Sequence, residues 1–231
     1  DFNAISDGQK QRIMLARAIC QEPEIIVLDE PTTYLDIRYK LELLDILKRM
    51  AKEKGITVLM SLHEIDLAQK CADRIVCVRG EEIMAYGTPE EVFYEETIEK
   101  LYDLDNGSYN PLSGSLELKK TEGEPEVFVI SSGGNGTPIY RKLQREGRPF
   151  AAGILYTNDV DYQAARVLAS KIITEEPFEE ISDNTYKNAE NMIDQCQIVV
   201  NAGVHIGSCN HRMRNLLQYA QEKGKLKRHY L

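Results

Sequence analysis

Two adjacent carboxylates follow a short apolar run near the start of the chain. Residues 25–28 read Ile-Ile-Val-Leu, and Asp29 and Glu30 come directly after them. Such a run predicts a buried strand of a parallel sheet, and open α/β sheets bind their ligands beyond the carboxyl ends of the strands. At that place Asp29 would hold Mg²⁺ through a water molecule, and Glu30 would orient or deprotonate the water that attacks a γ-phosphate. By themselves, two acids after an apolar run also fit a strand that ends in a solvated turn.

Three further polar motifs surround this pair of acids. Residues 5–12 read Ile-Ser-Asp-Gly-Gln-Lys-Gln-Arg, residues 31–36 read Pro-Thr-Thr-Tyr-Leu-Asp, and residues 61–64 read Ser-Leu-His-Glu. Together with the acids, these motifs resemble the ATP-binding subunits of ABC transporters, most closely the subgroup that serves iron-siderophore, haem and cobalamin importers. The resemblance is collinear through the four motifs and runs from about Asp1 to Leu104.

The resemblance implies that residues 5–12 form the signature loop of this family. Ser6, Gly8 and Gln9 match the loop residues that contact the γ-phosphate of an ATP molecule held by the opposing subunit. Ser6 lies just before a predicted helix, and a helix N-terminus with a hydroxyl cap favours anions. Asp7 stands where the family usually has glycine, and its charge would repel a triphosphate unless the side chain points away.

The resemblance also assigns the remaining motifs. Asp29 matches the Walker B aspartate that binds Mg²⁺, and Glu30 matches the catalytic glutamate. Asp36 matches the D-loop aspartate that crosses the dimer interface. His63 matches the switch histidine, which in the family bonds the γ-phosphate and senses its loss.

One motif of the family is missing from the sequence. No G-x-x-x-x-G-K-[ST] occurs among the 231 residues, and nothing matches the adenine-stacking aromatic residue or the Q-loop. The amides and lysine of that phosphate loop hold the β- and γ-phosphates, so we expect this chain alone not to hydrolyse ATP. Since the sequence opens on the signature motif with no strand before it, we expect a domain truncated at its N-terminal side.

For the intact protein, the resemblance implies an importer subunit that couples ATP hydrolysis to transport, with ATP and Mg²⁺ as cofactors. The expected partners are a second ATPase subunit, in a homodimer, and transmembrane permease subunits. Specificity for the transported substrate then lies in the permease and an external binding protein. We expect the protein to be cytoplasmic and bound to the membrane surface through the permease.

Composition agrees with a folded protein of this kind. Lys and Arg number 28 against 37 Asp and Glu, a net charge of −9, which disfavours a dedicated nucleic-acid binder. The longest apolar runs fall well short of the roughly 20 residues that a spanning helix needs, so we expect no direct membrane insertion. The five cysteines form no C-x-x-C pair and are typical of reduced thiols in a cytoplasmic protein.

A second α/β domain is predicted after the ATPase part. We expect a partial, RecA-like ABC ATPase domain over residues 1–108, a linker rich in Gly, Ser and Pro over 109–125, and a small Rossmann-like or flavodoxin-like three-layer domain over 126–231. Apolar runs alternate there with amphipathic helices.

The first predicted strand of this second domain leads into a glycine-rich loop. A glycine-rich turn that feeds a helix N-terminus can bind an anion, and it can equally be a structural tight turn. Asp159 and Asp161 could bind a ribose or serve as turn and cap residues. A second loop, residues 203–207, should meet the first at a topological switch point. The loop residues that could contact a ligand are Gly133, Gly134, Asn135, Gly136 and Thr137.

Two other functions fit parts of the sequence. An ABC ATPase of DNA repair or chromosome packing would share the motifs, but the chain has no flanking coiled-coil heptads. A small-ligand, nucleotide-type binding or regulatory module in the second domain, attached to an ABC remnant, is the alternative that stays open. His205, Cys209 and His211 lie close in sequence, but ligands within one loop and without a fourth partner are weak evidence for a metal.

Overall fold

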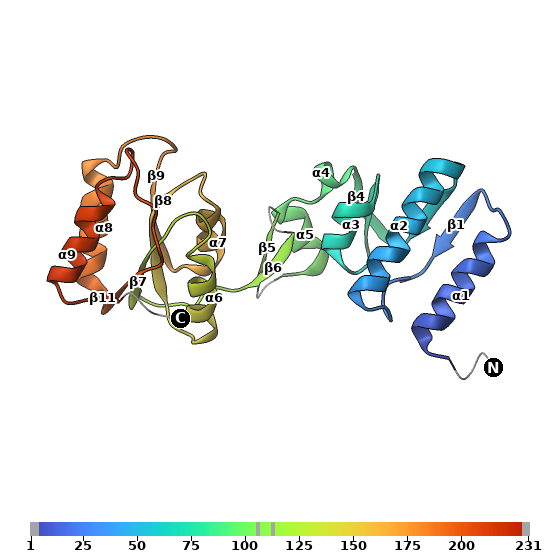
Figure 1. Cartoon of the computed structure of the whole chain (residues 1–231), viewed down its shortest axis with the longest axis horizontal. Helices are drawn as coiled ribbons and strands as arrows, with labels where there is room; N and C mark the ends of the chain where they lie inside the picture. Colours follow the sequence, from blue (N-terminus) through green and yellow to red (C-terminus); the bar gives the residue numbers. More distant parts are fainter. Residues whose placement is uncertain (1–4, 105–106, 112–113, 228–231) are drawn as a thin grey trace. The chain divides into compact units, whose positions relative to one another are not determined.

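The chain folds into two separate units. The computed structural model describes residues 5–104, 107–111 and 114–227 (Figure 1). The N-terminal unit comprises Asp1–Leu101 and the C-terminal unit Tyr102–Leu231.

The N-terminal unit alternates helices and short strands. Its elements in chain order are α1 (Asp7–Ile19), β1 (Ile25–Leu28), α2 (Ile37–Lys54), β2 (Thr57–Met60), α3 (Ile65–Cys71), β3 (Ile75–Arg79), β4 (Glu82–Gly87), α4 (Pro89–Val92) and α5 (Glu95–Tyr102). Strands β1 and β2 pair in parallel, and β3 and β4 form an antiparallel ribbon. The long crossover α2 begins at the cap residue Asp36 and ends at Gly55, whose φ of 67° suits a glycine C-cap.

Strand β1 is parallel, as predicted, but it is buried on one face only. Ile26 is 4% exposed and packs with α1 and α2, whereas Ile25 and Val27 are 61% and 70% exposed. Leu59, paired with Val27 on β2, is also exposed. The expectation of a fully buried strand was therefore wrong, because among the described residues the helices cover only one face of this strand pair. An apolar run alone does not tell one covered face from two.

The C-terminal unit is a doubly wound domain around a parallel sheet. Its strands and helices after residue 126 are β7 (Val127–Ile130), α6 (Thr137–Arg145), β8 (Phe150–Tyr156), α7 (Val160–Leu168), β9 (Lys171–Glu175), α8 (Asp183–Gln195), β10 (Ile198–Asn201), α9 (Met213–Glu222) and β11 (Leu226–Lys227). The sheet order is β11-β10-β7-β8-β9, and all neighbours are parallel. Counted along the chain this is the 3-2-1-4-5 order of a Rossmann half, not the 2-1-3-4-5 order of flavodoxin.

Helices cover both faces of this sheet, which gives the predicted three layers (Figure 1). On one face, α6 and α7 pack on inward residues of β7 and β8 through Tyr140, Leu143 and Leu168. On the other face, α8 and α9 pack through Ile193 and Leu216. Every residue of β7 is completely buried, so the switch point beside it is set on a rigid strand.

The predicted linker is wrong over much of its length. Residues 107–118 contain a β-hairpin, β5 (Gly107–Asn110) and β6 (Ser115–Leu118), which belongs to the C-terminal unit. Tyr109 on β5 is completely buried, and Glu117 on β6 forms an ion pair with Arg141 of α6. Gly, Ser and Pro are typical of hairpin turns as well as of linkers, so composition alone misplaced the boundary.

Candidate functional site

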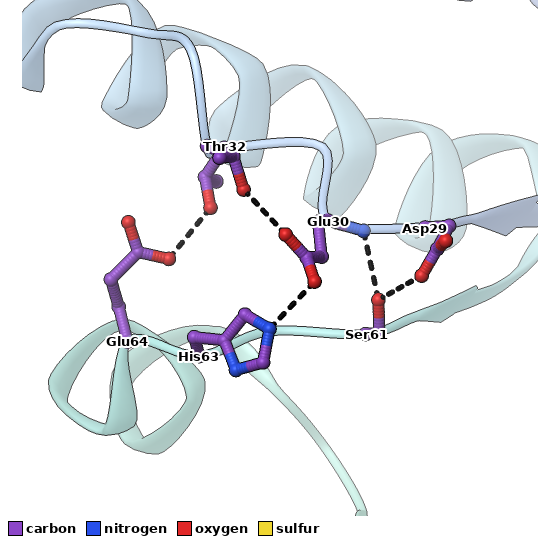
Figure 2. A network of polar contacts seen from close by, with 7 residues as sticks. Asp29, Glu30, Thr32, Ser61, His63 and Glu64 are labelled. Atoms are coloured by element: carbon purple, nitrogen blue, oxygen red, sulfur yellow. Dashed lines mark hydrogen bonds and ion pairs between the residues drawn. The ribbon is translucent and has the colours of Figure 1, made fainter.

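Parallel pairing of β1 and β2 brings two of the predicted motifs together. Leu28 lies opposite Met60 at the carboxyl ends of the two strands. The segments that follow, residues 29–33 and 61–64, therefore leave the sheet side by side (Figure 2). The predicted residues Asp29, Glu30 and His63 all lie in these two segments.

Ser61 joins the two acidic residues. Its hydroxyl donates to Asp29 Oδ1 at 2.7 Å and accepts the backbone N–H of Glu30 at 2.8 Å. Glu30 has a φ of 44°, a left-handed conformation that is uncommon for a residue other than glycine. The Ser61 hydroxyl thus accepts the N–H of Glu30, whose backbone is strained, and at the same time holds the Asp29 carboxylate by a hydrogen bond.

The carboxylate of Glu30 is held from two sides. His63 Nε2 lies 2.6 Å from Glu30 Oε1, and the Thr33 hydroxyl donates to Oε2 at 3.0 Å (Figure 2). The His63 and Glu30 side chains are 73% and 42% exposed. The predicted catalytic pair is therefore in direct contact and open to solvent.

A third polar group, Glu64, lies beside this pair. Thr32 Oγ1 donates to Glu64 Oε2 at 2.7 Å, and Lys40 of α2 forms an ion pair with Oε1. Thr32 is only 1% exposed. The hydrogen bonds from Lys40 and from Thr32 lower the pKa of Glu64 below its ordinary value.

Ser6 and Gln9 of the signature motif form the cap of α1. The Ser6 hydroxyl accepts the N–H of Gln9, and the Gln9 side chain accepts the N–H of Ser6, which is a capping box. Asp7 pairs with Lys10 at 2.9 Å, so the acid that replaces the family's glycine has a cation beside it. A Cβ added at Gly8 would lie 3.3 Å from the Tyr34 carbonyl oxygen, which shows how closely this helix start approaches the loop before α2.

Asp36 caps α2, because its side chain accepts the N–H of Tyr39 at 3.0 Å. The start of α1 at Gly8 therefore lies close to Tyr34 and Leu35, which directly precede Asp36. Within the described ranges no hydrogen bond or ion pair joins Ser6, Gly8 or Gln9 to Glu30 or His63.

The donor set fits Mg²⁺ held through water. Carboxylate oxygens and water are the ligands that Mg²⁺ prefers. Asp29 is exposed, and within the described contacts it uses Oδ1 for Ser61, which leaves Oδ2 to a metal-bound water. Asp29 is therefore the residue that would hold the ion.

The two glycine-rich loops of the C-terminal unit meet, as predicted, at the switch point between β7 and β10. The backbone N–H of His205 donates to Ser132 Oγ at 3.0 Å, and the Asn135 side chain donates to the Gly203 carbonyl at 3.1 Å. These contacts place loop 131–136 against loop 202–205 at the carboxyl ends of adjacent strands.

Three backbone amides of the first loop, those of Gly133, Gly136 and Thr137, already donate to carboxylates. Asp161 is completely buried, and its carboxylate accepts the N–H of Gly136 and both the N–H and the hydroxyl of Thr137. Asp159 accepts the N–H of Gly133 with both oxygens, each at 3.0 Å. The chain's own carboxylates thus occupy the amides at which the sequence suggested an external anion, so Gly136 and Thr137 have no N–H left for a phosphate.

Residues 205–211 make contacts within their own loop and with neighbouring loops. Cys209 Sγ donates to the Phe178 carbonyl, and His211 Nδ1 lies 2.8 Å from the Ser208 carbonyl. Within the described residues no cluster of three or more His, Cys, Asp or Glu side chains has the geometry of a metal site.

Two functional contacts escaped sequence reasoning. Ser61 and Glu64 were recognised only as neighbours of His63, although both reach the loop after β1. The signal that could have found them is the run of polar residues directly after β2, because the carboxyl end of the adjacent parallel strand faces them.

Two family profiles match parts of the chain. The family profile of ABC transporters matches residues 1–33, and that of the MJ0874 family matches residues 150–227. None of the helices in the described ranges has the length and hydropathy that crossing a bilayer requires.

Several curated relatives are ATP-binding proteins. An uncharacterized ABC transporter ATP-binding protein of Methanocaldococcus jannaschii is 39% identical over 156 residues, which is 67% of this chain and 54% of that protein. The cobalamin import ATP-binding protein of Halobacterium salinarum is 27% identical over 82% of this chain and 49% of its own length. The ferric enterobactin transport ATP-binding protein of Escherichia coli is 39% identical over 44% of this chain and 38% of its own length.

The chain thus spans about half the length of the curated relatives that it matches. The profile match to residues 1–33, these relatives and the four collinear motifs all indicate the same family. The N-terminal unit is part of an ABC transporter ATP-binding domain.

Proposed function

We propose that this chain is part of an importer subunit that couples ATP hydrolysis to the uptake of an iron-siderophore, haem or cobalamin-type substrate. The contact between Glu30 and His63, beside Asp29 at the ends of two parallel strands, carries the proposal. Named relatives that import cobalamin and ferric enterobactin support the substrate class.

In this mechanism each residue has a separate task. Glu30 orients the attacking water and takes its proton, and His63 donates a hydrogen bond to the γ-phosphate. Asp29 would hold Mg²⁺ through water, and the bound ion would supply positive charge to offset that of the phosphates. Because Glu30 Oε1 is 2.6 Å from His63, the imidazole must share or release that oxygen when the nucleotide is in place.

The test supplies the phosphate loop from a relative. A chimaera would carry the N-terminal part of the M. jannaschii relative followed by residues 1–231. We expect it to bind and hydrolyse MgATP, and we expect Glu30→Gln to keep binding while turnover falls by at least about a hundredfold. The matched control is Glu53→Gln, an exposed acid on α2 that should leave turnover unchanged. Undiminished turnover in the Glu30 variant would exclude it as the base.

The proposal includes a second copy of the subunit and a permease, through which the protein lies at the cytoplasmic face of the membrane. Ser6 of one subunit would face the ATP bound by the other, since its exposed cap at the start of α1 is suited to an anion. In the chimaera, Ser6→Arg should block ATP-dependent dimerisation measured by light scattering. Normal dimers would remove Ser6 from the interface.

For the C-terminal unit we propose a ligand-binding, regulatory role at the switch point, with loop 133–137 and loop 202–205 as its walls. The contacts between these loops favour it. The carboxylates of Asp159 and Asp161 already accept N–H groups of this loop, which are therefore not available to a phosphate. The ligand would instead be a hydroxyl or amine donor, such as a nucleoside. Titration of the whole chain with adenosine and with MgATP tests this by NMR. Shifts of Gly133 and Gly134 with adenosine are expected, and shifts with neither would reject it.

A further inference from the structure

We infer that Glu64 is a positioning residue: it anchors the segment that carries His63 to Thr32 and to Lys40, and so holds the imidazole against Glu30. The inference rests on the proposed function for its catalytic meaning, while its structural claim can be tested on the chain itself.

The contact between His63 and Glu30 is exposed to solvent and is therefore only weakly stabilised by the two side chains themselves. The imidazole is 73% exposed and reaches Glu30 from an irregular segment between β2 and α3. Exposed pairs of this kind contribute little to stability because water competes for both groups. The position of His63 must therefore be fixed by its backbone and its neighbours.

Glu64 provides that support. It occupies the cap position of α3, yet its side chain makes no capping hydrogen bond. Its carboxylate instead crosses to the loop after β1, where Thr32 Oγ1 donates at 2.7 Å, and to α2, where Lys40 pairs with it. Figure 2 shows Glu64 and His63 reaching this loop side by side.

The partners of Glu64 are well placed to act as anchors. Thr32 is 1% exposed, so its hydroxyl has a fixed position and would be left without an acceptor if Glu64 moved away. Lys40 lies one turn into the helix that Asp36 caps, and its side chain is 22% exposed. One carboxylate therefore connects the segment of the switch histidine to the loop of the catalytic glutamate and to the start of α2.

The experiment measures the His63 imidazole by NMR in the full chain. The sequence has only four histidines, so long-range nitrogen–proton spectra can be assigned by substitution. Two reference spectra define the scale. The unmodified chain gives the His63 chemical shifts with the contact to Glu30 present, and Glu30→Ala gives them after Nε2 has lost this acceptor. We expect Glu64→Gln, which loses the ion pair with Lys40, to move the His63 signals at least halfway toward the Glu30→Ala position.

Matched variants separate positioning from general damage. Thr32→Val removes the buried hydroxyl and should act like Glu64→Gln, whereas Thr32→Ser keeps the hydroxyl and should restore the original signals. Asp66→Asn breaks an exposed ion pair with Lys70 on the same α3 and should leave His63 unchanged. If Glu64→Gln does not fold, the two Thr32 variants decide the matter. Unmoved His63 signals in folded Glu64→Gln or Thr32→Val would overturn the inference.

The chimaera adds a kinetic arm. There, Glu64→Gln should lower kcat on the order of tenfold to a hundredfold while the KM for MgATP stays nearly constant, because the lost group orients the reacting groups and does not touch the nucleotide. If the chimaera does not hydrolyse ATP but His63 still shifts, the proposed function fails and the positioning stands. If ATP is hydrolysed and His63 does not shift, only the positioning fails.

Discussion

His63 Nε2 lies 2.6 Å from Glu30 Oε1, and the pair spans two segments that leave parallel strands side by side. Both side chains are substantially exposed. An exposed ion pair contributes about 0–1 kcal/mol to the free energy of unfolding, so stability alone gives little reason for this arrangement. The proposed function gives the arrangement a reason, since it assigns Glu30 and His63 to the hydrolysis of ATP.

The first prediction follows from this exposure. His63→Ala should change the free energy of unfolding of the N-terminal unit by less than about 1 kcal/mol. In the chimaera, the same change should lower ATP turnover by about a hundredfold or more, as removal of a group that stabilises developing charge does. Urea unfolding measures the free energy of unfolding, and a phosphate-release assay measures the rate of ATP turnover. A large loss of stability with normal turnover would mean that His63 has a structural role only.

The second prediction concerns the pH dependence contributed by Glu64. Hydrogen bonds from Lys40 and Thr32 lower its pKa in the folded chain below the ordinary value of 4.5. A group with a lowered folded-state pKa stabilises the fold above its unfolded-state pKa, and this contribution is lost as the pH falls through the folded-state value. The difference in melting temperature between the unmodified chain and Glu64→Gln should therefore be constant above about pH 5 and shrink as the pH falls below 4.5.

This measurement should follow NMR signals of the N-terminal unit, because the chain contains two units that can unfold separately. Asp66→Asn again serves as the control, since its pair with Lys70 is exposed. A difference that grows toward acid pH would contradict the assignment of the anchor to an ionised Glu64.

Much of the arrangement of Asp29, Glu30 and His63 could be predicted because it follows from the order of the strands along the chain. Asp29 and His63 each follow an apolar strand, and parallel strands bring their carboxyl ends to one edge. The meeting of the loops around Gly133 and Gly203 could be predicted for the same reason. Local sequence could not reveal that Asp161, more than twenty residues away, fills the amides of Gly136 and Thr137. A carboxylate near a turn looks the same whether it caps its own helix or a neighbouring loop.

Two other features could not be predicted, because the same local composition is compatible with two different structures. Tyr109 lies in a stretch of turn-forming residues, and nothing local distinguishes a linker from a hairpin that packs against α7 and has a buried aromatic residue. Val27 belongs to an apolar run that fits one covered face as well as two. Both depend on long-range packing, which periodicity does not report.

The third prediction tests whether Asp161 holds the glycine-rich loop at Gly136 and Thr137 in the C-terminal unit. Asp161→Asn replaces a buried carboxylate that accepts three hydrogen bonds with an amide that can accept at only one atom. Hydrogen bonds to charged groups contribute roughly 1.5–3 kcal/mol each, so we expect a loss of at least about 2 kcal/mol in the free energy of unfolding. Hydrogen exchange of the β7 and β10 amides measures this loss of stability within the C-terminal unit.

The control for this change is Asp183→Asn. Asp183 is 97% exposed, lies in the first turn of α8 and pairs with Arg212, so its loss should cost no more than about 1 kcal/mol. Equal effects of the two variants would show that Asp161 does not hold the loop in the way its contacts indicate.

The fourth prediction concerns Gly136, the residue at the start of α6. A Cβ built there would lie 2.4 Å from Ser131 Oγ and 2.6 Å from the Tyr140 hydroxyl, two groups that are hydrogen-bonded to each other and completely buried. Gly136→Ala must displace this pair, and overpacking of a filled core costs typically about 1–3 kcal/mol. Gly207→Ala provides the control, since its nearest neighbour would lie at 3.9 Å, in ordinary contact. Protection of the β7 amides from hydrogen exchange should weaken in the first variant and stay unchanged in the second. Equal protection in both variants would show that the side chains around Tyr140 can move aside without loss of stability.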